Sequence, residues 1–236
     1  MMKTILFDLD GTLLPMPSQE EFVKVYFHLL TKVDNYDPKR VIDTLIKGTK
    51  AMVQNDGNRT NEEVFWGVYR QELNDLISED LDDIKAKYEI FYNTEFDKCQ
   101  STALANPLAR KLIDELRQEG YHLILATNPL FPRVAVEKRL AWIDLKFEDF
   151  DFVSTNENMG YCKPNPKYYE SILAKNGLNA EEVIMVGNDV NEDIKASAKA
   201  GIDSILVTDT IIGSVNDVDV ESVEFKDLLN AIHNKS

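Results

Sequence analysis

Short uninterrupted apolar runs recur along the chain, each bounded by polar or turn-forming residues. Such runs are typical of strands buried on both faces of a sheet, and they lie at residues 4–9, 121–127, 183–187 and 204–208. Around the last three runs, apolar residues recur at helical spacing, at residues 107–120, 133–143, 166–177 and 192–201. This alternation predicts an α/β fold in which helices sandwich a parallel sheet.

Residues 16–104 follow a helical pattern and contain no such run. Asp37 before Pro38 is typical of a helix start, because Asp caps the first free N–H groups and proline fits the first helical position. Thr60 followed by Glu63 has the spacing of a capping box. We therefore expect an all-helical insert of about four helices after the first strand.

This organisation predicts two domains. A discontinuous α/β core domain would comprise residues 1–15 and 105–236, and a helical cap domain would comprise residues 16–104. Aromatic side chains in the cap could contact a substrate, but at helical spacing they are more typical of a packed core, which is the interpretation we favour. The residues in question are Phe22, Tyr26, Trp66 and Tyr69.

The charge of the chain restricts its partners. Its 236 residues are 44% hydrophobic, enough for a packed core, and carry a formal net charge of −15. This excess of acid argues against nucleic acid and against anionic membrane surfaces. It also means that an anionic substrate needs a local cation or lysine to offset the repulsion.

Other features of the sequence predict a cytoplasmic protein. No apolar run approaches the ~18 residues of a membrane span, and an aspartate interrupts the first apolar stretch too early for a signal peptide. Cys99 and Cys162 are isolated and form no C-x-x-C pair. We expect a small-molecule substrate and a monomer or homodimer.

Polar and charged residues follow the predicted strands at their carboxyl ends. Asp8 and Asp10 end the first strand, Thr127 and Asn128 follow the second, and Asp189 follows the third. In open parallel sheets, ligands bind outside this edge. These side chains are therefore candidates for one common site.

Two more candidates come from later segments. Asp193 lies one helical turn after Asp189, and Lys163 stands between prolines in the segment "CKPNP". Considered one at a time, Asp10 with the following glycine could form a turn, Thr127 or Asp189 could cap a helix, and Lys163 could be a solvated surface residue. Their convergence on one sheet edge favours a functional site.

The residue types indicate the chemistry. Crowded carboxylates repel one another, and Mg²⁺ relieves this repulsion because it prefers a few carboxylates together with phosphate and water oxygens. An EF-hand is excluded, since the acidic segment follows a strand and Gly11 stands where a further ligand is needed. The Asp-x-Asp spacing allows one carboxylate to attack while the other transfers protons.

Four segments resemble, in order and spacing, the four motifs of the haloacid dehalogenase superfamily: "DLDGT", "ATN", "CKPNP" and "GNDVNED". The resemblance covers the α/β part of the chain and implies a Rossmann-like core. The insert is similar to the small helical cap of the subgroup that acts on small soluble substrates. The resemblance implies an Mg²⁺-dependent phosphatase that hydrolyses a small phosphomonoester through an aspartyl-phosphate.

The resemblance also implies a role for each matching residue. Asp8 would be the nucleophile, and Asp10 would protonate the leaving group and then activate water. Thr127 would bind the transferred phosphoryl oxygens, together with the backbone of Asn128. Lys163 would neutralise the nucleophile and the phosphoryl group.

The same resemblance implies a metal site. Asp8, the backbone carbonyl of Asp10 and Asp189 would ligate Mg²⁺. Asp193 would support the site through a water or through Lys163.

Asp10 favours phosphoryl transfer over dehalogenation, because displacement of a halide needs no proton and dehalogenases proper lack this second aspartate. Two alternatives stay open. A phosphomutase would need a cap that shields the aspartyl-phosphate from water. A non-catalytic phosphoryl sensor such as a receiver domain also gathers Asp, Thr and Lys at strand ends, but the helical insert argues against it.

Overall fold

The computed structural model describes residues 4–33, 36–74 and 80–235. Within these residues, six parallel strands form one sheet in the order β3-β2-β1-β4-β5-β6. This α/β arrangement, with helices on both faces, confirms the predicted fold class. The strands are β1 (Thr4–Phe7), β2 (His122–Leu125), β3 (Phe152–Val153), β4 (Val183–Gly187), β5 (Asp203–Val207) and β6 (Glu221–Val223).

The four predicted strands are all present, as β1, β2, β4 and β5. The sequence missed β3 and β6, because these edge strands have only two and three residues and no buried apolar run. The helices that cover the sheet are α5 (Pro107–Gln118), α6 (Arg133–Ala141), α7 (Pro166–Asn176), α8 (Ala196–Lys199) and α9 (Leu228–Lys235). The helix predicted at 192–201 begins as a π-helical segment, Val190–Lys195, that runs into α8.

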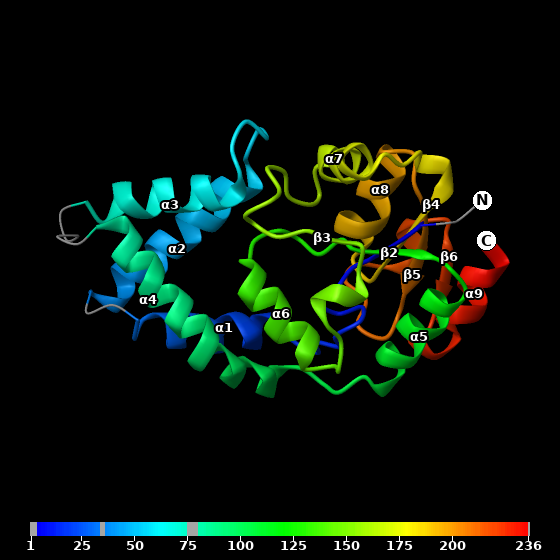
Figure 1. Ribbon diagram of the computed structural model, residues 1–236, viewed down its shortest axis with the longest axis horizontal. Coiled ribbons are helices and arrows are strands. Elements are labelled where there is room, and N and C mark those ends of the chain that lie inside the picture. Colours follow the sequence, from blue (N-terminus) through cyan, green and yellow to red (C-terminus); the bar gives the residue numbers. More distant parts are fainter. Residues whose placement is uncertain (1–3, 34–35, 75–79, 236) are drawn as a thin grey trace.

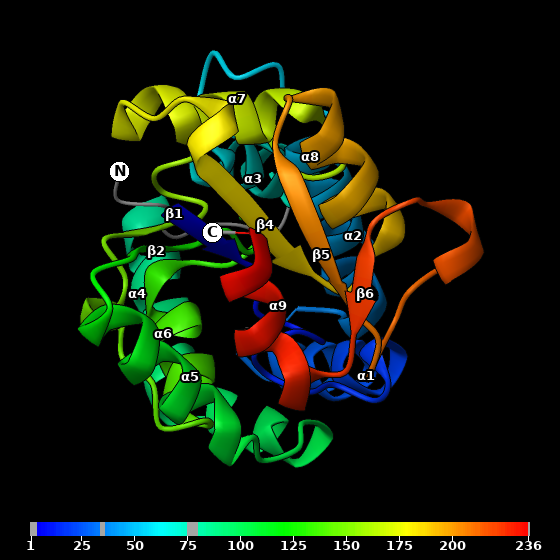
Figure 2. The same ribbon diagram turned by 90° about the vertical axis from the view of Figure 1, so that its right-hand side faces the viewer.

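Side chains of β1, β2 and β4 alternate between two apolar layers. Ile5 and Phe7 of β1 belong to a core that includes residues of α5, α6 and α9, whereas Leu6 belongs to a second core with residues of α7 and α8. Figure 2 shows α7 and α8 on one side of the sheet and α5, α6 and α9 on the other. Burial on both faces explains why the strands read as continuous apolar runs.

Between β1 and α5, the described residues contain no strand. They form α1 (Gln19–Leu30), α2 (Pro38–Val53), α3 (Asn61–Glu72), α4 (Leu81–Thr94) and a 3-10 helix, Phe96–Thr102. Asp37 caps α2, and the capping box of Thr60 and Glu63 begins α3, so both predicted helix starts are confirmed. Figure 1 shows these four α-helices at one end of the molecule, with the sheet and both termini at the other.

Besides the packing of α4 and the 3-10 helix against α6, backbone hydrogen bonds join the helical region to the sheet region at two places. The Leu104 N–H donates to the Pro15 carbonyl at 2.9 Å, so the two connecting segments lie side by side. The division of the chain into domains at these segments stays a prediction. At the second place, buried Asn61 at the start of α3 donates through its backbone N–H to the Met159 carbonyl (2.8 Å) and through Nδ2 to the Pro129 carbonyl (3.1 Å). These bonds hold α3 against the loops that follow β2 and β3.

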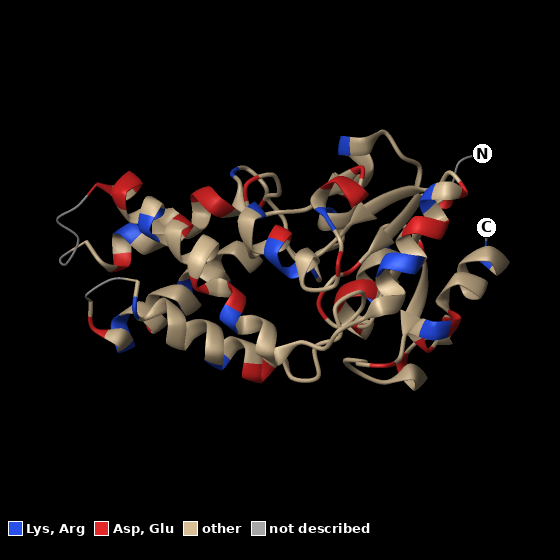
Figure 3. Cartoon of the chain, turned by 60° about the horizontal axis from the view of Figure 1, so that its bottom comes forward, with Lys and Arg blue, Asp and Glu red and all other residues tan. Residues whose placement is uncertain are grey.

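Acidic side chains occur in both regions. Figure 3 shows Asp and Glu on helices around the sheet as well as on helices of the insert. No helix in the described part of the chain is both long and apolar enough to cross a membrane.

Candidate active site

The predicted site residues gather at the carboxyl edge of the sheet. Thr127 and Asn128 follow β2, Lys163 lies between β3 and α7, and the aspartates follow β1 and β4, which are neighbours in the sheet. This is the point where the strand order reverses, and ligands of such sheets bind there. A cavity of about 710 Å³ opens at this edge. Six of the predicted residues line it: Asp8, Asp10, Thr127, Asn128, Asp189 and Asp193.

Lys163 lies behind these residues and links two of them. Its Nζ donates to Asp8 Oδ1 at 2.8 Å and to Asp193 Oδ1 at 2.6 Å. Only 1% of Lys163 is exposed, so it is not a solvated surface lysine. Burial opposes its charged form, but Asp193 and Asp8 outweigh that effect and raise the pKa of Lys163 well above its ordinary value. The ammonium is therefore a fixed positive charge beside Asp8.

Asp193 also organises the turn after β4. Its Oδ2 accepts hydrogen bonds from the backbone N–H groups of Asn188 (3.0 Å) and Asp189 (2.9 Å). A Cβ at Gly187 would collide with this carboxyl group, so the end of β4 needs glycine. Asp193 contacts Lys163 directly, which makes it a residue that positions both the lysine and the turn.

Asp8 accepts a second bond from a residue that the sequence did not single out. The Thr12 hydroxyl donates to Asp8 Oδ2 (3.1 Å) or to Asn188 Oδ1 (3.2 Å). The chain turns back toward Asp8 at Gly11, whose φ is +95° and where a Cβ would collide with Asn188. The glycine of the "DLDGT" motif thus lets Thr12 hold the Asp8 carboxylate in place.

Asp10 pairs with Arg139 of α6, a residue that the sequence gave no reason to select. Arg139 is fully buried, donates through Nη1 to Asp10 Oδ2, and lies over the Phe131 ring at 4.4 Å. Burial raises the pKa of Asp10, while Arg139 opposes the rise. Asp10 Oδ1 is buried and has no hydrogen-bond partner among the described residues. That oxygen is free to exchange a proton with a bound molecule.

We expect Arg139→Met to lower the free energy of unfolding by about 3 kcal/mol or more, because it leaves the Asp10 carboxylate largely buried without its cation. Chemical denaturation monitored by circular dichroism measures the change. Arg117→Met is the matched control: Arg117 pairs with Asp151, but its side chain is 41% exposed, so a loss below ~1 kcal/mol is expected. Equal losses in the two variants would contradict a stabilising role for the buried pair.

Hydrogen bonds from neighbouring side chains hold Thr127 and Asn128 in place. The Thr127 carbonyl accepts hydrogen bonds from Ser154 Oγ (2.6 Å) and Tyr168 Oη (2.8 Å). Asn128 Nδ2 donates to Glu192 Oε2 at 2.9 Å, while its Oδ1 is buried and unpartnered within the described chain. These contacts fix the loop after β2 at the edge of the site.

Asp189 can both cap a helix and ligate a metal, the two roles considered from the sequence. Its Oδ1 accepts from the N–H groups of Asn191 (2.7 Å) and Glu192 (2.8 Å), so it caps the π-helical segment. Its Oδ2 accepts no hydrogen bond among the described residues and remains free. Asn188 is engaged at both ends, because its Nδ2 donates to the Thr210 carbonyl at 2.7 Å and its Oδ1 accepts from a hydroxyl.

The donor set fits Mg²⁺. Asp8 and Asp189 offer carboxylate oxygens, and the Asp10 carbonyl accepts no hydrogen bond within the part of the chain that is described. The described residues contain no group of three or more His, Cys, Asp or Glu placed to hold a metal. Two carboxylates and one carbonyl need no such group, since Mg²⁺ keeps several waters and binds substrate phosphate.

The aromatic residues of the helical region divide between two environments. Tyr69 is fully buried in the core and does not line the cavity, as core packing predicts. Phe22 is also buried in that core, but it lines the cavity as well. Tyr26 and Trp66 pack against the core and line the cavity too. Helical spacing could not separate these cases, because it gives the buried face of a helix but not what lies opposite.

Comparisons with known proteins give a consistent result. The chain is 29% identical over 220 residues to the pyrophosphatase PpaX of Bacillus velezensis. The aligned region covers 89% of this chain and 85% of PpaX. A 2-haloacid dehalogenase from Pseudomonas syringae shares the fold with a TM-score of 0.65, 18% identity and full coverage of both chains. The hydrolase YfnB of Bacillus subtilis, bound to magnesium, does so with a TM-score of 0.57, 20% identity and 98% coverage of each chain.

The family model of haloacid dehalogenase-like hydrolases matches residues 2–201. This match confirms the resemblance that the four motifs carry. The chain belongs to the haloacid dehalogenase-like hydrolases.

Proposed function

We propose that this hydrolase is an Mg²⁺-dependent phosphatase that acts on a small phosphomonoester through an aspartyl-phosphate on Asp8. The observation that carries the proposal is the buried Lys163, which bridges Asp8 and Asp193 at the edge of the cavity. A lysine in this position offsets the charge of the nucleophile and of an incoming phosphoryl group. It supplies the local cation that an acidic protein needs to bind an anion.

In the first step, an Asp8 carboxylate oxygen forms a bond to phosphorus as the bond to the leaving oxygen breaks. Asp10 gives its proton to that oxygen, so the product leaves as a neutral alcohol. In the second step, Asp10 takes a proton from a water molecule that attacks phosphorus, which releases phosphate and restores the Asp8 carboxylate. Mg²⁺, held by Asp8, Asp189 and the Asp10 carbonyl, would offset the negative charge of the phosphoryl oxygens.

The size of the required rate enhancement explains why several groups converge. Phosphate-monoester hydrolysis needs accelerations of up to ~10²¹, whereas one acid–base group supplies only ~10²–10⁴. Fixed charges and positioning must provide most of the remainder. Lys163, Thr127 and the Asn128 backbone are the groups we assign to that task, with Asp193 holding Lys163 in place.

Asp10 supports phosphoryl transfer rather than dehalogenation. Displacement of a halide produces no leaving group that needs a proton, so a second aspartate would have no task. The similarity to a 2-haloacid dehalogenase concerns the fold alone at 18% identity. The relative PpaX is a pyrophosphatase, which makes pyrophosphate a compound to test alongside phosphomonoesters.

We expect Mg²⁺-dependent release of inorganic phosphate from p-nitrophenyl phosphate and from at least one member of a phosphomonoester panel. EDTA should abolish release, and excess Mg²⁺ should restore it, because the metal neutralises the crowded carboxylates and the phosphate. A colorimetric phosphate assay measures both effects. Undiminished turnover in EDTA would contradict the metal requirement. Absence of turnover with every compound, in a folded protein, would contradict the proposed function.

A further inference from the structure

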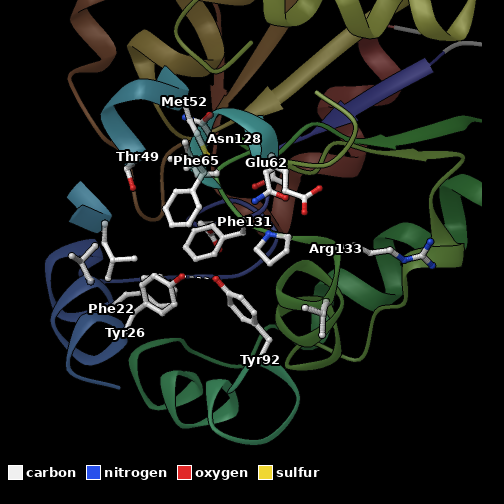
Figure 4. Close-up of a pocket in the computed structure, with 18 of the residues that line it drawn as sticks. Phe22, Tyr26, Thr49, Met52, Glu62, Phe65, Tyr92, Asn128, Phe131 and Arg133 are labelled. Atoms are coloured by element: carbon white, nitrogen blue, oxygen red, sulfur yellow. Dashed lines mark hydrogen bonds between the residues drawn. The ribbon is translucent and has the colours of Figure 1, made fainter. Parts of the chain in front are cut away.

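The walls of the cavity that lie away from the strand ends are largely aromatic. Eight rings from α1, α3, α4 and the loop after β2 contribute: Phe22, Tyr26, Phe27, Phe65, Trp66, Tyr88, Tyr92 and Phe131. Figure 4 shows the hydroxyl groups of Tyr26 and Tyr92 pointing toward one another. A molecule that places its phosphate at Asp8 would have the rest of its body among these rings.

Tyr26 and Tyr92 add little polarity to this wall. The hydroxyl groups of Tyr26 and Tyr92 form a 2.6 Å hydrogen bond with each other. Tyr26 also stacks on Phe22 with ring centroids 5.8 Å apart. One hydroxyl donates to the other, so a single O–H of the pair remains to donate elsewhere, and both residues offer mainly ring surface to a ligand. The wall therefore suits an apolar or aromatic group.

The charged residues outside the strand-end cluster are mostly acidic. Five glutamates line the cavity, against two basic residues, Lys85 and Arg133. Both bases already face an acid: Lys85 Nζ lies 3.4 Å from a Glu62 oxygen, and Arg133 Nε lies 2.6 Å from a Glu137 oxygen. Each base is therefore already paired with a carboxylate, which reduces the positive charge that it offers to an anionic group of the substrate.

The other three glutamates are less directly neutralised: Arg133 acts electrostatically on Glu157, and Lys163 on Glu192, but at longer range. Within the described residues, no Lys, Arg or His forms an ion pair with Glu89, Glu157 or Glu192. Glu157 Oε1 accepts from the backbone N–H of Arg133 at 2.8 Å, and Glu192 accepts from an asparagine amide. An anion bound among the rings would meet these carboxylates, none of which is closely paired with a cation in the described part of the chain.

Among the described residues of the lining, the unpartnered polar atoms that are fully buried are hydrogen-bond acceptors. Glu157 Oε2 and Asn128 Oδ1 are buried without a partner among the described residues. The orientation of the Asn128 amide follows from its bond to the Glu192 carboxylate, since only the NH₂ group can donate to it. Buried acceptors of this kind favour a ligand that brings hydrogen-bond donors.

We infer that the leaving group of the substrate is an alcohol without negative charge, with an aromatic or other apolar body and at least one further hydrogen-bond donor, such as a hydroxyl or ammonium group. The inference rests on the proposed phosphatase function. It distinguishes this chain from an enzyme for pyrophosphate or for phosphate esters of hydroxy acids, whose leaving groups are anionic. Those compounds would gain little from the rings and would be repelled by the glutamates.

Three para-substituted phenyl phosphates test this inference, with 2-hydroxyethyl, 2-aminoethyl and carboxymethyl substituents. Two methylene groups separate the hydroxyl and the ammonium group from the ring and one separates the carboxylate, so the acidities of the three phenols are similar and charge is the main variable. We expect kcat/KM for the neutral and cationic esters to exceed that for the carboxylate by about tenfold or more. Pyrophosphate, added as a fourth compound, should be a poorer substrate than either favoured ester.

Glu157→Gln adds a second readout. We expect it to raise kcat/KM for the carboxymethyl ester relative to the aminoethyl ester by several-fold, because one repelling charge is removed. Glu170→Gln, at an exposed position of α7, is the matched control and should leave this ratio unchanged.

Three outcomes overturn the inference. Equal or better use of the carboxymethyl ester, or of pyrophosphate, would refute the inference and leave the phosphatase function standing. An unchanged ratio in Glu157→Gln would refute the assignment of charge selection to the cavity glutamates. Phosphate release from none of the four compounds, nor from p-nitrophenyl phosphate, would refute the proposed function and the inference with it.

Discussion

Replacement of Asp8 by asparagine is expected to reduce Mg²⁺-dependent phosphate release by roughly 10⁴-fold or more. The asparagine amide has almost the size of the carboxylate, but it is a poor nucleophile and carries no charge for Lys163 or Mg²⁺ to bind. The single amide oxygen of the variant can still accept from Lys163, which contacts Asp8 at 2.8 Å, while the Thr12 hydroxyl keeps its other acceptor, Asn188 Oδ1. The loss should therefore appear in kcat rather than in folding.

Steady-state phosphate release and thermal melting, measured on the same preparations, separate these effects. Asp8→Ala accompanies Asp8→Asn as a variant that cannot revert to aspartate by deamidation. Asp43→Asn is the matched control, because Asp43 lies exposed on α2 and makes the same change in net charge. If either Asp8 variant kept a tenth of the wild-type kcat, Asp8 would not be the nucleophile.

Lys163→Met is expected to cost about 3–5 kcal/mol of the free energy of unfolding and to reduce kcat by roughly 10²–10³-fold. The methionine fills similar space but leaves two carboxylates, Asp8 and Asp193, without their shared cation. The loss of the cation destabilises the Asp193 carboxylate most, since only 2% of its side chain is exposed to water. Urea denaturation and phosphate release measure the two effects separately.

The double variant Lys163→Met with Asp193→Asn distinguishes stability from catalysis. It removes the buried pair together, so much of the lost stability should return while activity stays low, because Asp8 still lacks its cation. The asparagine oxygen can still accept from the backbone of Asn188 and Asp189. Lys175→Met, exposed on α7, is the control and should change stability little. A Lys163→Met protein as stable as this control would contradict the role of the buried pair.

The sequence by itself determined the principal elements of the fold, because their signals are local. Four strands coincide with apolar runs, which are typical of strands buried on both faces. The caps at Asp37 and Thr60 begin the helices that they predict. The sequence also placed Asp8 and Asp189 at one sheet edge, since parallel strands have their carboxyl ends on the same side. The sequence did not predict the short edge strand β3, because two residues are too few to show a periodic pattern.

Only the tertiary structure decided which side chains surround those aspartates. Arg139 reaches Asp10 across 129 positions of sequence, and no local pattern distinguishes it from a surface arginine on the same helix. Asn61 likewise looks like an ordinary first residue of a helix, yet it joins α3 to the loops beside the site. Which aromatic rings face the cavity also depended on how α1, α3 and α4 pack together. Contacts between distant segments arise from the packing of whole elements. Local sequence patterns therefore do not specify the chemistry of the cavity.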